Sequence, residues 1–272
     1  GGQLEFARPL AVTAAGGFTS NTPDKVAVTA LPGSGFAIAY FVNPSVESVE
    51  LKFRWFSSSG VEIAQRSYFI DNDDLPDPAS VQILARPNGD LLAIVEEGDR
   101  FVTRIVPQSG SLGGANLLVK FSEGEFQSVQ DAALLANGGA VALIRNSADG
   151  FPELDDFGAF YLKFITAAGV SNGGVPVEVA YNDEEQDRVL NARLAVLSNG
   201  NIVVAWSEKP DTEGATHDVQ VKIYSQTGTL LYTRTDVNAP LLTGDQLLED
   251  VVALADGGFT LVWKHAGVYT YA

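Results

Sequence analysis

One short motif recurs five times in this chain of 272 residues, and its spacing limits the possible folds more than any other feature. The copies are "LPGSGFAIAY", "RPNGDLLAIV", "LANGGAVALI", "LSNGNIVVAW" and "LADGGFTLVW". The first apolar residues after the turn are Phe36, Leu91, Ala140, Ile202 and Phe259, separated by 55, 49, 62 and 57 residues. Asn-Gly or Asp-Gly between two apolar runs is typical of a tight hairpin turn. Each copy therefore predicts two antiparallel strands.

A second recurring pattern adds two strands to each repeat. The segments "LKFRWFSSSG", "FVTRIVPQSG", "AFYLKFITAAG" and "VQVKIYSQTG" all end at a glycine, and six residues earlier stand Arg54, Arg104, Lys163 and Lys222. A further strand-like run follows each: "VEIAQRSYFI", "ANLLVKF", "VPVEVAY" and "TLLYTRTDV". Four strands in a unit of this length, repeated five times, are typical of a β-propeller. The sequence predicts an all-β, five-bladed β-propeller with four antiparallel strands per blade.

The two chain ends are predicted to share the last blade. We expect a single domain over 1–272, with blades at about 24–70, 78–121, 127–181, 189–237 and 247–272 plus 3–12. The fifth repeat ends within its third strand, whereas "QLEFARPLAV" alternates apolar and other residues before the first repeat. The segment 3–12 is therefore predicted to complete the last blade, which leaves no open sheet edge there.

Composition excludes several classes of partner and chemistry. With no Cys, the chain has no disulfide, no Cys-based zinc site and no Cys nucleophile. A net charge of −17 argues against nucleic acid and anionic membranes as partners. The longest apolar runs are too short to insert in a membrane. Because the chain also has no Met, we expect a processed protein or a piece of a longer one.

The acidic residues are concentrated in the longer loops. If the first strand of each blade is innermost, these loops share one face, and they hold 23 of the 34 Asp and Glu. Loops on a rigid scaffold commonly carry function, so this acidic face is the predicted working face, the alternative being a merely solubilising surface. The stretch "DNDDLPD" has the oxygen density that calcium favours, so Asp71, Asp73 and Asp77 form a candidate calcium site; the alternative is a charged loop. Calcium is the only cofactor suggested.

The innermost strands supply a candidate ligand site. Aligned on the repeat, Ala27, Asp131, Arg193 and Asp250 coincide, and Gln82 matches if blade 2 carries one extra residue. Asp131, Arg193, Asp250 and Gln82 are predicted to form a ligand-binding cluster at the mouth of the central channel. The alternative is an ordinary hydrated channel lining.

The histidines, the tryptophans and the basic residues of the third strands are expected to have structural rather than functional roles. His217 and His265 are expected to be exposed loop residues. Trp206 and Trp263 occupy equivalent strand positions and are expected to pack between blades, whereas Trp55 is expected to be more exposed. The basic residues six positions before the second glycine are expected to pair with acids on neighbouring strands.

Two functions remain open at this stage. The first is a binding or structural module whose acidic face contacts a glycan, a protein or calcium. The second is a polysaccharide-active enzyme, a glycoside hydrolase or lyase, because two carboxyls about 6.5–9.5 Å apart perform inverting glycoside hydrolysis and Asp131 and Asp250 are candidates. The chain contains no GxSxG, HExxH or phosphate-binding loop motif.

The pattern "VxALxDGGFxLVW…VxxKxFxxxG" resembles propeller-like repeats of very large secreted bacterial proteins, especially type I-secreted RTX proteins and adhesins. The resemblance covers all five repeats and is strongest over 249–265 and 192–208, while the tryptophan of the pattern is kept only at Trp206 and Trp263. It implies an extracellular or cell-surface location, a multidomain parent protein and an association with calcium. It implies no catalytic residue, and the RTX nonapeptide itself does not occur in this chain.

Overall fold

The computed structural model describes residues 26–42, 48–71, 80–97, 100–120, 126–147, 158–180, 189–209, 215–235, 237, 244–265 and 268–271. These residues form five antiparallel sheets, which confirms the all-β, five-bladed propeller. Blade 1 contains β1 (Val26–Leu31), β2 (Gly35–Val42), β3 (Ser48–Phe56) and β4 (Glu62–Asp71). Blade 2 contains β5 (Val81–Ala85), β6 (Leu91–Glu97), β7 (Arg100–Val106) and β8 (Asn116–Lys120). Blade 3 contains β9 (Phe126–Leu134), β10 (Ala140–Ser147), β11 (Gly158–Ile165) and β12 (Val177–Ala180).

Blade 4 contains β13 (Val189–Val196), β14 (Ile202–Glu208), β15 (Asp218–Tyr224) and β16 (Leu230–Arg234). Blade 5 contains β17 (Gln246–Ala253), β18 (Phe259–His265) and β19 (Val268–Tyr271). In every sheet the strands are hydrogen-bonded in sequence order, as the repeat predicts. The segment 3–12 lies outside the described residues, so its place in the last blade stays a prediction. No helix in the described part of the chain is long and apolar enough to cross a membrane.

The hairpin turns use glycine and its Asn or Asp neighbour in different ways. In blade 3, Gly138 has a φ of 81°, and its N–H donates to the Leu135 carbonyl at 3.0 Å. The Asn137 side chain instead accepts the Gly139 N–H at 2.9 Å. The same side-chain acceptor recurs at Asn88, Asn199 and Asp256. Only glycine therefore supplies the left-handed conformation in these four turns, while Asn or Asp closes the turn with a hydrogen bond.

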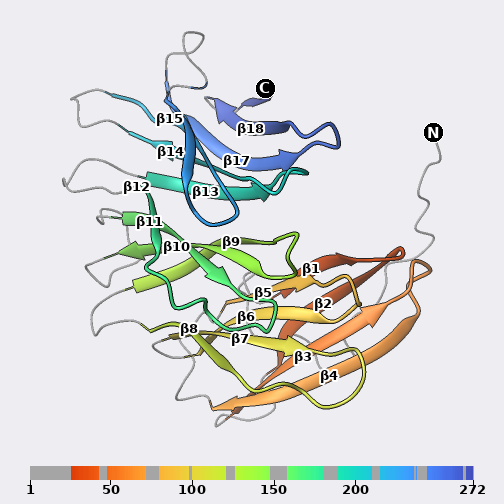
Figure 1. Cartoon of the computed structure of the whole chain (residues 1–272). Coiled ribbons are helices and arrows are strands. Elements are labelled where there is room, and N and C mark those ends of the chain that lie inside the picture. The colour runs from red at the N-terminus through yellow and green to blue at the C-terminus, as the bar shows by residue number, and fades with distance from the viewer. Residues whose placement is uncertain are drawn as a thin grey trace.

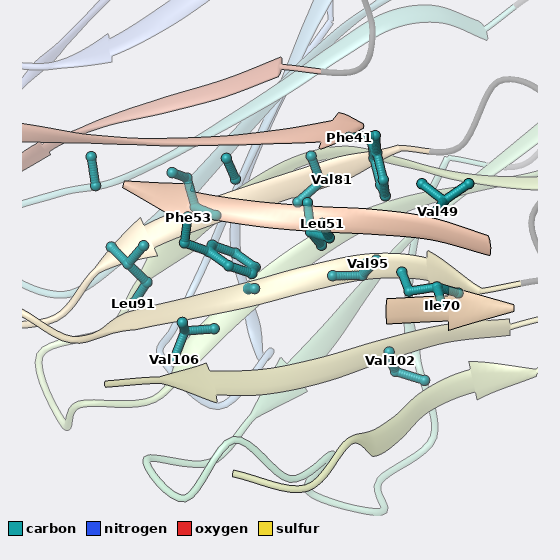
Figure 2. Packing of buried hydrophobic residues seen from close by; sticks show 14 of the residues in the cluster. Phe41, Val49, Leu51, Phe53, Ile70, Val81, Leu91, Val95, Val102 and Val106 are labelled. Atoms are coloured by element: carbon teal, nitrogen blue, oxygen red, sulfur yellow. The ribbon is translucent and has the colours of Figure 1, made fainter. Parts of the chain in front are cut away.

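The core consists of apolar layers between successive blades. The innermost strands β1, β5, β9, β13 and β17 pack against one another in order, and the sheets stack face to face (Figure 1). Between blades 1 and 2, Leu51 and Phe53 of β3 point toward Leu91 and Val95 of β6 (Figure 2). Comparable layers lie between blades 2 and 3, 3 and 4, and 4 and 5. This packing fixes the positions of the five innermost strands. It therefore determines which residues face the centre of the propeller.

The three tryptophans all pack between blades. Trp206 and Trp263 are 3% and 4% exposed within the layers on either side of blade 4, as expected from their equivalent positions. The expectation that Trp55 is more exposed is wrong, because its side chain is fully buried between blades 1 and 2. Its Nε1–H donates to the carbonyl of Gly89, in the first turn of blade 2, at 3.0 Å. Trp55 therefore joins two blades by both packing and a hydrogen bond.

The basic residues of the third strands mostly contact carbonyl groups. Arg54 pairs with the Glu62 carboxylate, as predicted, with Nε 3.0 Å from Oε2. Arg104 donates to the Gly113 carbonyl, and Lys163 to that of Gly174, at 2.8 and 3.3 Å. Lys222 donates to the carbonyl of Val179 in the preceding blade. Arg104 and Lys163 thus hold connecting segments in place, and Lys222 joins two blades. Among these four contacts, only that of Arg54 in blade 1 is with a carboxylate.

Candidate functional site

The inner column, which we define as Ala27, Gln82, Asp131, Arg193 and Asp250, occupies one register position in all five blades. Each member pairs with the third residue after the repeat anchor, for example Asp131 with Leu143 and Asp250 with Val262. Gln82 pairs with Ile94 in the same way. The expected extra residue in blade 2 is therefore wrong, and Gln82 needs no insertion to match. Asp131, Arg193 and Asp250 lie near the middle of their strands.

Blades 3, 4 and 5, and not blade 2, have an extra residue in the innermost strand. In each of them a β-bulge lies just before the inner-column residue. Gln130 is unpaired before Asp131, and Glu249 is unpaired before Asp250. In blade 4 the irregularity falls before Arg193 and includes Asn191, whose φ of 52° is left-handed. Bulges commonly lie beside active sites, where they redirect a side chain. The three charged members of the inner column thus share a local backbone irregularity that Gln82 and Ala27 lack in the described strands.

Asp131 is the most constrained member of the inner column. Its Oδ2 accepts the N–H of Leu194, in β13 of the next blade, at 2.9 Å. Its Oδ1 accepts the N–H of Ala132 at 2.8 Å. The carboxyl group is therefore held in one orientation by two backbone donors from different blades.

Burial raises the pKa of the Asp131 carboxyl, and this effect outweighs the two hydrogen bonds and the Arg193 guanidinium, which all lower it. The Asp250 carboxylate adds to the increase. Asp131 thus lies within electrostatic reach of Arg193 and of Asp250, which come from two other blades. The Asp250 side chain is exposed, and its Oδ1 accepts the Val251 N–H at 2.8 Å.

Part of the inner column also connects blades. Gln82 donates from Nε2 to the Val129 carbonyl of β9 at 3.1 Å, so it joins blade 2 to blade 3 as Asp131 joins blade 3 to blade 4. Arg193 donates to the carbonyl of Ala192, its own neighbour, at 2.9 Å. Gln82 therefore has a structural role, whereas Asp250 is the member most accessible to a ligand.

The two histidines are not simply exposed loop residues, which corrects that expectation. His217 Nδ1 lies 3.0 Å from Oδ1 of Asp245, and the pair of hydrogen bonds from His217 lowers the Asp245 pKa. Gln246 donates its N–H to the His217 carbonyl at 2.8 Å and also contacts His265 Nδ1 through its amide. The loops of blades 4 and 5 therefore converge here. Asp245 lies directly before the innermost strand β17. This position in the sequence could have identified it as a partner of His217.

The predicted calcium ligands are largely outside the described structure. Asp71 is the last residue of β4, while Asp73 and Asp77 fall in the segment that is not described. Among the residues that the structure describes, no three His, Cys, Asp or Glu side chains group as a metal site. The calcium site at Asp71, Asp73 and Asp77 stays a prediction.

The inner column combines groups that acid–base chemistry requires. Asp131 is a sheltered carboxyl with a raised pKa, which favours the protonated form that can donate a proton. Asp250 is a second, exposed carboxyl, and Arg193 supplies a permanent positive charge between these strands. Such a set can bind the hydroxyl groups of a sugar, and it can act on a bond that needs one proton donor and one acceptor.

Comparisons with known proteins confirm the fold. No protein-family model matches the chain, and no curated protein matches it. An α-L-arabinanase from Penicillium chrysogenum, solved with arabinobiose, is 12% identical with a TM-score of 0.57, covering 91% of this chain and 77% of its own. An α-L-arabinofuranosidase from Fusarium graminearum is 8% identical with a TM-score of 0.54, covering 91% and 75%. An apocarotenoid oxygenase from Synechocystis is 10% identical with a TM-score of 0.51, covering 88% and 55%. The similarity is one of fold, and the fold hosts different chemistries.

Proposed function

We propose that the inner column is a carbohydrate-active site that binds a neutral polysaccharide and hydrolyses its glycosidic bonds. The observation that carries this proposal is the sheltered Asp131 carboxyl, whose pKa burial raises and which lies within electrostatic reach of the exposed Asp250 carboxylate. Two carboxyls in different environments are the usual machinery of glycoside hydrolysis, one donating a proton and the other activating water. This proposal corresponds to the second hypothesis from the sequence, a polysaccharide-active enzyme.

Each charged member has a distinct role in this scheme. Asp131 donates its proton to the leaving oxygen, and the carboxylate that remains is stabilised by the Leu194 and Ala132 N–H groups. Asp250, two blades away from Asp131, removes a proton from the attacking water. Its exposed side chain is accessible to that water molecule. Arg193 lies on the strand between them and limits the repulsion of the two carboxylates. Cleavage of the glycosidic bond consumes one water molecule. Its hydroxyl group ends on the anomeric carbon of one product, and the leaving oxygen of the other product gains a proton.

A non-catalytic glycan-binding site is the second candidate. It is favoured by the residues of blades 1 and 2, because Ala27 and Gln82 contribute no carboxyl group to the inner column. In that case Asp131 and Asp250 accept hydrogen bonds from sugar hydroxyls. The extracellular location implied by the sequence resemblance is compatible with both candidates, and we include it in the proposal.

The test is a double substitution, Asp131→Asn with Asp250→Asn. Linear arabinan is the first substrate because two of the similar structures are arabinan-type hydrolases, and xylan, β-glucan and mannan complete the panel. We expect the wild-type chain to release reducing ends from one polymer and the double variant to lose turnover while still binding it.

Binding without release of reducing ends by the wild-type chain would establish the second candidate instead. Neither binding nor cleavage across the panel would refute both. Glu249→Gln is the matched control, since it removes the exposed carboxylate next to Asp250 and lies outside the inner column, and it should retain turnover.

A further inference from the structure

A groove of about 370 Å³ lies between blades 1 and 2, at the hairpin-turn ends of their strands. Its walls come from residues 31–35 and 56–58 of blade 1 and from residues 87–89 of blade 2, and Ile63 and Gln108 complete the lining. The volume lies within the range of roughly 300–1,000 Å³ that is typical of small-molecule sites. None of the lining residues belongs to the inner column, so the groove is separate from the site described above.

The groove is open because blade 1 has a short side chain where two other blades have a glutamine. The residue two positions before the glycine of the second turn is Gln108 in blade 2 and Gln226 in blade 4. Each of these glutamines lies beside the left-handed glycine of the first turn in its own blade. The equivalent residue of blade 1 is Ser58. Apart from its chain neighbours, no heavy atom lies within 4 Å of the position that a Cβ of Gly33 would take.

Ser34 gives the groove a hydroxyl group at a position of backbone strain. Its φ is 75°, whereas the equivalent residue of the four other blades is glycine: Gly89, Gly138, Gly200 and Gly257. The left-handed conformation is unfavourable for serine, and such strain is concentrated at binding and active sites. The Ser34 hydroxyl makes no hydrogen bond with another residue that the structure describes. No contact within the described part of the protein therefore accounts for a serine at this place.

Blade 2 supplies two side-chain amides on a well-anchored backbone. Asn88 donates to the Asp90 carboxylate at 2.7 Å and accepts the Asp90 N–H at 3.2 Å. The N–H of Gln108 donates to Asp90 Oδ1 at 3.1 Å, and its carbonyl accepts from Arg66 of blade 1 at 2.8 Å. A ligand therefore meets polar residues whose positions are already fixed, which lowers the entropic cost of binding.

The polar groups of the groove can be reached from solvent. Ser34, Ser58 and Asn88 are exposed, and Gln108 is half-buried. Among the residues that the structure describes, none is hydrogen-bonded to the Ser58 hydroxyl or to the side-chain amide of Gln108. Two hydroxyl groups from blade 1 and two amides from blade 2 are thus available to the same ligand.

Apolar surface borders these polar groups. Pro32 and Pro87 occupy one repeat position, which is Ala or Ser in the other three blades. Both prolines are exposed, and Ile63 is 54% exposed. The groove therefore offers C–H surface next to hydroxyl and amide groups.

We propose that this groove binds an uncharged oligosaccharide. None of the residues that line it is charged, in a chain with a net charge of −17, so neither an anion nor a cation finds a counter-charge there. Hydroxyl and amide side chains both donate and accept hydrogen bonds, as the neighbouring hydroxyls of a sugar do. The C–H face of a sugar ring can pack on the prolines and Ile63.

An extended peptide fits the groove less well. Such peptides commonly bind by adding a strand to a free sheet edge. The walls of this groove are turns whose backbone groups bond to each other, as the Ser57 N–H does to the Val61 carbonyl at 2.8 Å.

The groove goes beyond the proposed hydrolysis and does not depend on it. Its lining comes from blades 1 and 2, whereas the carboxyl groups of the inner column come from blades 3 and 5. Affinity for a trisaccharide is expected in the millimolar range, because few hydrogen bonds and little area are involved.

The indole N–H signals in ¹⁵N NMR of the full chain test this site. Trp55 donates its Nε1–H to the carbonyl of the lining residue Gly89 at 3.0 Å, whereas Trp206 and Trp263 pack in other layers and serve as internal references. The probes are arabinotriose, xylotriose, cellotriose and mannotriose, with trigalacturonate and a capped, uncharged tetrapeptide as controls. We expect at least one neutral trisaccharide, and neither control, to shift the Trp55 signal in a saturable manner.

Two variants alter the groove without threatening the fold. Ser34→Gly introduces the residue of the other blades and should weaken binding about fivefold through loss of one hydrogen bond. Its urea midpoint should stay the same or rise, because the strain is removed. Ser58→Gln fills the groove with the side chain found in blades 2 and 4, and should weaken binding by about tenfold or more.

Two further variants are controls that should bind like the wild-type chain. Ala167→Gln places the same side chain at the equivalent exposed turn position of blade 3. Asp131→Asn should leave the Trp55 titration unchanged even if it abolishes hydrolysis, which separates this site from the inner column.

The proposal is overturned if no neutral trisaccharide gives a saturable shift of the Trp55 signal. Equal affinities for the wild-type chain and for the folded Ser34 and Ser58 variants would overturn it too. A tighter response to trigalacturonate or to the tetrapeptide than to any neutral trisaccharide would refute the assignment to an uncharged glycan. A loss of stability in Ser34→Gly would contradict the role given to the Ser34 hydroxyl.

Discussion

Replacement of Trp55 by phenylalanine tests how blades 1 and 2 are joined. Trp55 is fully buried, and its Nε1–H reaches the Gly89 carbonyl at 3.0 Å. The substitution removes one hydrogen bond, leaves the carbonyl unpaired, and opens a cavity the size of part of an indole ring. Loss of the donor costs about 1–3 kcal/mol, and the cavity adds roughly 1 kcal/mol. We expect the free energy of unfolding to fall by about 2–4 kcal/mol.

Trp263→Phe is the matched control. Trp263 is 4% exposed, and its Nε1 has no hydrogen-bond partner among the described residues. The same truncation therefore opens a similar cavity but removes an unpaired donor, and it should cost about 1 kcal/mol or less.

Urea unfolding followed by circular dichroism and by fluorescence measures both changes, and agreement of the two probes checks that one transition is observed. The difference between the two variants isolates the hydrogen bond that crosses the blades. Equal losses of stability in the two variants would refute the reasoning, because packing alone would then account for both.

Three further predictions concern titration and the chain ends. Burial raises the pKa of Tyr68 and Tyr224 above the ordinary tyrosine range, so alkaline spectrophotometric titration should leave at least two of the 8 tyrosines un-ionised until the protein unfolds; reversible ionisation of all of them in the folded protein would contradict this. Burial also raises the pKa of Glu96 despite two hydrogen bonds from Ser80, so the native state binds this proton more tightly than the unfolded chain and stability falls as pH rises through the raised value. Glu96→Gln should lessen that fall in chemical-denaturation series between about pH 4 and pH 8, and parallel curves for the two proteins would argue against it. Deletion of 1–12 should lower the free energy of unfolding by about 5–9 kcal/mol, because Leu4, Phe6 and Leu10 are predicted to be buried in the last blade. A truncated chain that melts within a few degrees of the full one would exclude a role for this segment in that blade.

The architecture was predictable because the repeat aligns on its turns. A turn fixes the pairing of the two strands that follow from it, so the inner column could be aligned by counting from Phe36, Leu91 and their equivalents. The burial of Trp55 was also available from the sequence. It follows Arg54 directly, and neighbouring residues in a strand point to opposite faces, so an outward-facing arginine implies an inward-facing tryptophan.

Other features needed the three-dimensional arrangement. A bulge at Gln130 or Glu249 adds a residue on the side of the inner column away from the turn, where the alignment has no anchor. The Asp245–His217 contact joins loops of two blades. Such contacts depend on how blades are placed against each other, which a pattern within one repeat does not contain.

The most direct test of the proposed site is a ¹³C NMR titration of the Asp131 side-chain carboxyl in the full chain, with and without an oligosaccharide. We predict a pKa above the ordinary value for aspartate, and a change in it when the oligosaccharide binds. Asp250→Asn should lower this pKa, and Arg193→Gln should raise it, because each removes a charge that now acts on the carboxyl. An ordinary pKa for Asp131 that neither substitution nor a saturating oligosaccharide alters would contradict the assignment of the inner column as the working site.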